Sequence, residues 1–165
     1  MTMLRQLNRI SGAVGALAVA LTIASSFASS FAIAAPAYVP GLGELMGAIQ
    51  LRHAKLWFAG QAGNWPLAAY ELDELNEGFD DVRTYQPHFK GMPIAKTLKV
   101  TIREPLEQLE AAVKAKDAAR FEMAFDAVSQ ACSSCHREMG HGFIVIQRPT
   151  APPLTNQRFA VDARP

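Results

Sequence analysis

The chain has 165 residues, of which 50% are hydrophobic and 19% charged, and its formal net charge is +1. A balance so close to neutral gives no indication of nucleic-acid binding, which depends on a strongly basic surface. The length fits a single domain with a sizeable core. Only two cysteines are present, so no framework of several disulfides can stabilise that core.

Residues 1–34 have the pattern of a secretory signal peptide. Arg5 and Arg9 give a charged start, an apolar run follows, and Ala32-Ile33-Ala34 has the small-x-small pattern of a cleavage site. Cleavage there would remove both arginines, change the formal charge from +1 to −1 and place the mature protein in the periplasm. The alternative is an uncleaved membrane anchor, because residues 12–35 carry no charge.

Apolar residues at helical spacing predict a first helix over residues 42–60 and a second that follows it closely. Asn64 is the expected N-cap of the second helix, which we expect to stop between Gly78 and Val82. Prolines and a glycine then indicate a loop over residues 84–93.

A third helix is predicted from residue 94 to residue 113, with Pro105 in its middle. Proline removes a helical hydrogen bond, so we expect a kink there or two short helices that meet at Glu104. Asp117 is the expected N-cap of a fourth helix that ends at Gly140 and carries the most regular apolar stripe of the chain.

Helices joined by short loops pack antiparallel, so the sequence predicts an all-α fold, an antiparallel up-down four-helix bundle over residues 40–141. Residues 142–165 contain several prolines and a short β-prone run, Phe143-Ile144-Val145-Ile146. This C-terminal tail is either an extended strap that docks on the bundle or a disordered segment.

Both cysteines lie in the pentapeptide Cys132-Ser133-Ser134-Cys135-His136. CxxCH is the attachment pattern of c-type haem, in which two thiols bind the macrocycle and the histidine is the proximal iron ligand. On a helix, residues three and four apart share a face, which suits this chemistry. The alternatives are a thioredoxin-like redox pair, a structural zinc site that includes His141, and a simple Cys132–Cys135 disulfide.

The segment Ala131-Cys132-Ser133-Ser134-Cys135-His136-Arg137-Glu138-Met139, at the end of the last amphipathic helix, resembles the class II cytochromes c. These are the cytochrome c-prime type four-helix bundles and their six-coordinate relatives. The resemblance implies one covalent haem c bound by Cys132, Cys135 and His136. The chain departs from the family in continuing for 29 residues after His136, which marks it as a divergent branch.

The distal iron position has three candidate states. Met46 and His53 both lie near the apolar stripe of the first helix, and the third state is a vacant or water-bound site. Methionine raises the reduction potential and a second histidine lowers it. Six-coordinate members of the family take a methionine from this region, as the resemblance implies. His88 and His141 are weaker candidates because both fall in predicted loops.

Charged residues of the first two helices allow two interpretations. Arg52 and Lys55 are either partners of the haem propionates or part of a solvated face. Residues 64–82 contain six acids and no base, which indicates either a docking patch for a basic partner or an ordinary solvated helix face.

The predicted function is that of an exported mono-haem c-type cytochrome that transfers electrons in the periplasm and is not an enzyme. The alternatives are a haem protein that binds or senses NO or CO at an open distal site, and the haem subunit of an exported oxidoreductase. Expected partners are periplasmic redox proteins, and a homodimer is left open. No nucleic acid and no membrane span after signal cleavage are expected.

Overall fold

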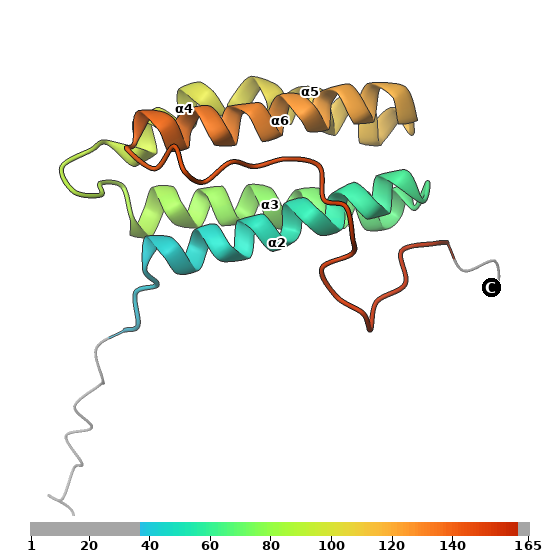
Figure 1. Cartoon of the computed structure of the whole chain (residues 1–165), viewed down its shortest axis with the longest axis horizontal. Helices are drawn as coiled ribbons and strands as arrows, with labels where there is room; N and C mark the ends of the chain where they lie inside the picture. The colour runs from blue at the N-terminus through green and yellow to red at the C-terminus, as the bar shows by residue number, and fades with distance from the viewer. Residues whose placement is uncertain (1–36, 162–165) are drawn as a thin grey trace, which may run out of the picture. The chain divides into compact units, whose positions relative to one another are not determined.

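Five helices are the regular elements of the computed structural model, which describes residues 37–161 (Figure 1). Within that range the backbone forms no strand, only an isolated bridge between Phe89 and Met92. The prediction of an all-α protein is therefore confirmed. The predicted signal peptide lies outside the described residues.

Helices α2 (Leu42–Gln61) and α3 (Trp65–Tyr85) form a hairpin joined by a turn at Gly63, whose φ is +63°. Asn64 caps α3 as predicted, because its side-chain oxygen accepts a hydrogen bond from the Leu67 N–H at 3.3 Å. The predicted end of α3 between Gly78 and Val82 is wrong. Gly78 serves close packing instead, since a Cβ there would lie 2.8 Å from Ile49 Cγ1 of α2.

The predicted third helix is two helices, α4 (Ile94–Thr101) and α5 (Arg103–Ala115). They meet at Ile102 rather than at Glu104. Pro105 then lies in the first turn of α5, where a backbone N–H has no partner within the helix and its loss costs nothing. The prediction of two short helices is confirmed, but they meet two residues earlier than expected. Proline is tolerated within the first turn of a helix, so the helix starts before it.

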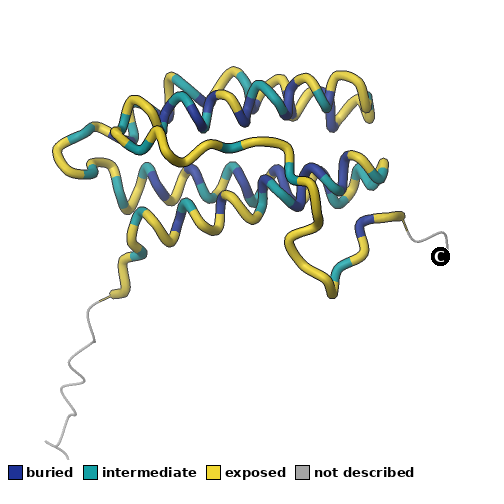
Figure 2. The backbone as a smooth tube through the Cα atoms, in the orientation of Figure 1, coloured by how far each residue is buried: buried dark blue, intermediate teal, exposed yellow. Residues whose placement is uncertain are grey.

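Helix α6 (Ala118–Glu138) follows a turn at Lys116, whose φ is +56°. Asp117 caps it as predicted, with its Oδ1 accepting from the Arg120 N–H at 3.0 Å. In Figure 1, α2 and α3 form one layer and α4, α5 and α6 form the other. Figure 2 shows buried positions recurring along every helix, and they form one core. None of these five helices is long and apolar enough to cross a membrane.

Residues 143–161 contain no helix or strand and run along α6 before turning towards α2 (Figure 1). The Arg148 guanidinium donates to both carboxylate oxygens of Asp126, at 2.7 and 2.8 Å. Farther on, Phe159 is buried, its ring centroid 5.6 Å from that of Phe58. Asn64 Nδ2 donates to the Phe159 carbonyl at 3.0 Å. In this structure the segment is therefore docked on the helices.

Candidate functional site

A cavity of about 310 Å³ lies where α2 begins and α6 ends, within the size range of small-ligand sites. Its lining brings together Cys132, Cys135 and His136 from α6 with Met46 and His53 from α2. The remaining walls are mostly apolar and come from α3, α4, the loop before α4 and the docked segment, with Leu75, Phe79, Phe89, Ile94, Leu98, Ile144 and Ile146 among them.

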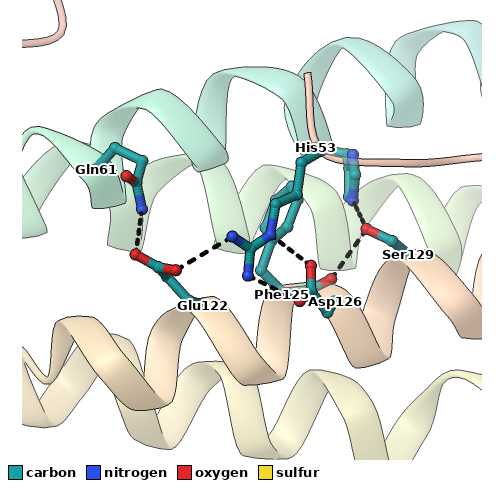
Figure 3. Close-up of polar contacts among 7 residues, drawn as sticks. His53, Gln61, Glu122, Phe125, Asp126 and Ser129 are labelled. Atoms are coloured by element: carbon teal, nitrogen blue, oxygen red, sulfur yellow. Dashed lines mark hydrogen bonds and ion pairs between the residues drawn. The ribbon is translucent and has the colours of Figure 1, made fainter. Parts of the chain in front are cut away.

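Two hydrogen bonds set the register of α2 against α6 (Figure 3). Gln61 Nε2 donates to Glu122 Oε1 at 3.1 Å, and His53 pairs with Ser129 Oγ at 2.9 Å. Moving eight residues back along α2 therefore corresponds to moving seven residues forward along α6, so the helices run antiparallel. A further seven residues, about 10 Å along each axis, lead from His53 to Met46 and from Ser129 to His136.

The register thus brings Met46 and His136 to the same level on opposite helices. Met46 is half-buried and lines the cavity. His53 lines the same cavity two turns deeper. Both predicted distal candidates therefore reach the site, but only Met46 is level with the histidine of the motif.

A backbone contact holds His136 in the tautomer that leaves Nε2 available to bind a metal ion. Its Nδ1 lies 3.0 Å from the carbonyl oxygen of Ile144. Because a carbonyl can only accept, Nδ1 carries the proton, and the lone pair of the neutral ring is on Nε2. Ligating histidines in proteins commonly donate their other ring N–H to a backbone carbonyl in this way.

His53 has a different environment. Ser129 donates its hydroxyl proton to the Phe125 carbonyl at 3.0 Å, which leaves Ser129 Oγ to accept from His53 Nε2–H. The imidazole also stacks on the Phe125 ring with a centroid distance of 4.2 Å. Burial lowers the pKa of His53 to about 4, so the ring is neutral at pH 7. Its Nε2 is committed to a protein partner.

Both cysteines are free thiols, Cys135 buried and Cys132 half-buried. Burial, with the neighbouring Cys135 as a second cause, raises the pKa of Cys132 to about 12, and burial also raises the pKa of Cys135. Catalytic redox cysteines need the opposite, an environment that stabilises the thiolate. The thiol pair therefore does not have the electrostatics of a thioredoxin-like site.

Gly43 and Gly47 lie on the cavity side of α2, beside Met46. A Cβ built on either would have no heavy atom of the described residues within 4 Å, apart from its chain neighbours and the adjoining helix backbone. Glycine weakens a helix interior by up to about 1 kcal/mol relative to alanine. Both glycines are exposed, so each leaves open space beside the helix backbone at this edge of the cavity.

The sequence ranked His141 only as a weaker candidate and did not indicate that Phe89 lies at the site. His141 follows α6 in a loop, as predicted, but the chain folds back so that its ring lines the cavity. It lies 5.9 Å from the Phe89 ring, which also lines the cavity, and 5.7 Å from the Phe143 ring. His88 is not part of the lining. Such contacts depend on loop paths, for which the sequence carries no periodic signal.

The tautomer of His141 is set by a backbone contact. Its Nδ1 lies 2.8 Å from the carbonyl oxygen of Met139, which accepts the ring proton. The Nε2 atom of His141 thus carries the lone pair, as in His136. Among residues 37–161, no three His, Cys, Asp or Glu side chains gather as they would around a bound metal ion.

Arg52 and Lys55 do not belong to a solvated face, contrary to one of the two interpretations. Arg52 pairs with Glu71 at 3.2 Å and with Glu74 at 2.6 Å, and Lys55 pairs with the other oxygen of Glu71. Glu71 is fully buried between α2 and α3. Neither cation lines the cavity. Because Glu71 and Glu74 are paired, the acidic stretch of α3 is also less negative than its composition indicates.

Comparison of the chain with protein-family models, curated proteins and solved structures finds no match.

Proposed function

We propose that this chain is an exported mono-haem cytochrome of the class II type, a four-helix bundle that transfers electrons in the periplasm. In this proposal α4 and α5 together act as the third helix of the bundle, and residues 143–161 are its docked tail. The observation that carries the proposal is the cavity, whose α6 wall holds the two thiols and His136, the last with its Nε2 lone pair available.

Cys132 and Cys135 would hold the haem by thioether bonds, and His136 Nε2 would be the proximal ligand to iron. When bound, the haem supplies an iron that changes its charge by one electron. The apolar walls would limit the access of water, and solvent access and local dielectric are among the factors that set a haem potential. The Ile144 carbonyl would fix the orientation of the His136 ring.

Met46 would be the second iron ligand, because the register puts it level with His136. His53 has its Nε2 engaged with Ser129 and stacks on Phe125. Met46→Ala should therefore convert a low-spin site to a high-spin one and lower the potential. His53→Ala should leave the spin state unchanged and destabilise the fold by about 1–3 kcal/mol through the lost polar contact.

Optical and paramagnetic-resonance spectra of the two variants test this assignment. Exchanged phenotypes would make His53 the distal ligand. If neither substitution changes the spin state, neither side chain is the ligand, and His141→Ala then tests the third imidazole of the cavity wall.

The main experiment is expression of the full chain in a host that attaches haem covalently. The denatured polypeptide should carry the added mass of one haem, and its colour should remain with the protein after acid–acetone extraction. Cys132→Ala combined with Cys135→Ala should abolish both signals. Colour that extracts into the organic phase, or one zinc per chain without haem, would contradict the proposal.

A second candidate function is the binding of a gas at an open distal face. The open space beside Gly43 and Gly47 is the observation in its favour. A ferrous spectrum that is high-spin and changes on addition of carbon monoxide or nitric oxide would support gas binding. A low-spin spectrum that neither gas changes would support electron transfer.

A further inference from the structure

We infer that residues 143–146 form part of the haem site and that Ser133, inside the CxxCH motif, is a positioning residue for His136. This inference rests on the proposed function, because its consequence is a change in the iron potential. Ser133 acts through the docked backbone of Ile144 and Ile146.

After α6 the chain folds back towards His136. Gly140 adopts a φ of +73°, and the His141 N–H then donates to the His136 carbonyl at 2.7 Å. The Ile144 N–H donates to the His141 carbonyl at 2.9 Å. Two successive turns therefore bring the Ile144 carbonyl to the Nδ1 edge of the His136 ring, where it accepts the Nδ1 proton at 3.0 Å.

Ser133 anchors that backbone. The Ile146 N–H donates to Ser133 Oγ at 2.9 Å, and the Ile146 carbonyl lies 3.2 Å from the same oxygen. Ser133 is buried and lies one turn before His136 on α6. One hydroxyl therefore binds the segment two residues beyond the carbonyl that holds the histidine.

Ser134 provides a matched comparison within the same motif. Its hydroxyl accepts from Arg137 at 2.8 Å, an exposed contact within α6. The two serines thus share residue type, helix and motif, but only Ser133 contacts residues 143–146.

The contact between His136 and Ile144 would affect the iron potential. A carbonyl that accepts the Nδ1 proton makes the imidazole a more basic ligand, which favours the oxidised iron over the reduced iron. The His136–Ile144 contact is exposed, so water competes for the same proton unless the segment holds the carbonyl in place. Loosening the segment should therefore raise the potential.

The test compares Ser133→Ala with Ser134→Ala in the full-length holoprotein. Both variants should carry one covalent haem by mass. Ser133→Ala should raise the midpoint potential by up to the equivalent of a tenfold change in the reduction equilibrium, about 59 mV for one electron. Ser134→Ala should leave the potential unchanged. Nitrogen-15 NMR of His136 should show faster exchange of the Nδ1 proton in Ser133→Ala alone.

Equal potentials in both variants and the wild type, with an unchanged Nδ1 signal, would overturn the inference while leaving the proposed function intact. A wild-type protein without haem would overturn the proposed function, and the Nδ1 signal of that protein would still decide whether Ser133 holds His136. If Ser133→Ala does not fold, Arg148→Gln loosens the segment from its other side, at Asp126, and should shift the potential in the same direction.

Discussion

Glycines at the two ends of the α2–α6 interface have opposite surroundings, close packing at Gly60 and open space at Gly47. At one end, Gly60 packs so closely on Phe121 that a Cβ would lie 2.2 Å from its ring carbons. Aromatic rings fill this end, with Trp57 and Phe125 4.9 Å apart between centroids. At the other end, a Cβ on Gly47 would meet no heavy atom of residues 37–161 within 4 Å beyond its own helix backbone and chain neighbours.

One helix pair therefore closes at the aromatic end and stays open at the end that carries the CxxCH motif. The cavity of about 310 Å³ at this end has mostly apolar walls and is partly open to solvent, which is the usual form of a small-ligand site. His53 and Ser129 mark the boundary between the two ends.

The largest expected loss of stability comes from removing an aromatic ring at the closed end of the interface. Phe125 is fully buried and supports the rings of both Trp57 and His53. Phe125→Ala should lower the free energy of unfolding by about 3–5 kcal/mol, because the removed ring leaves a cavity. Denaturant titration measures the loss. Met123→Ala, at an exposed position of the same helix, is the control and should stay within about 0.5 kcal/mol.

Burial of His53, at the boundary between the two ends, should make the free energy of unfolding depend on pH. The native pKa of His53 is about 4 instead of 6.5, so the unfolded chain takes up a proton that the native state resists. The resulting stability is present above pH 6.5 and is lost as the pH falls towards 4, by roughly 3 kcal/mol. Unfolding free energies across this pH range should show the slope.

His53→Gln should remove that slope. His88→Gln, at an exposed histidine, is the control and should leave the pH dependence caused by His53 unchanged. A slope that survives in His53→Gln would mean that another group causes it.

The close approach at Gly60 gives the third prediction. Gly60→Ala places a methyl group against the Phe121 ring, which is itself buried and cannot move freely. Overpacking of this kind should lower the free energy of unfolding by about 1–3 kcal/mol. Thermal or denaturant unfolding measures it. An unchanged stability would mean that the aromatic end is less tightly closed than the structure indicates.

Local signals in the sequence predicted the helices and their caps well. Asn64 and Asp117 act as N-caps, and the proline-induced break occurs within one turn of its expected place. These features depend on residues close together in the chain. Gly78 shows where local signals fail. It was interpreted as a helix end, but it lies inside α3, where the absence of a side chain allows close contact with Ile49 of α2.

The sequence predicted those site residues that belong to the CxxCH motif or to the apolar stripe of a helix. One cavity is lined by Cys132, Cys135 and His136 of the motif together with Met46 and His53. The contact of Ser133 with Ile146 and the burial of Glu71 were not predictable, since each depends on how distant segments pack. Spacing along a helix fixes which side chains share a face but not which partner covers that face.

The smallest expected effect tests whether the open end is filled. In the haem-free variant with Cys132→Ala and Cys135→Ala, Gly47→Ala should raise the free energy of unfolding by about 0.5–1 kcal/mol. Alanine is the better helix former, and the space beside Gly47 accepts a methyl group. In the haem-loaded protein the same methyl would enter an occupied cavity, so the gain should vanish or change sign.

Comparing Gly47→Ala in the two backgrounds isolates the contribution of the bound group, because the helix-propensity term is common to both. An equal gain in both backgrounds would mean that the wall beside Gly47 stays open even when haem is attached. The contrast between Gly60 and Gly47 would then reflect helix packing alone.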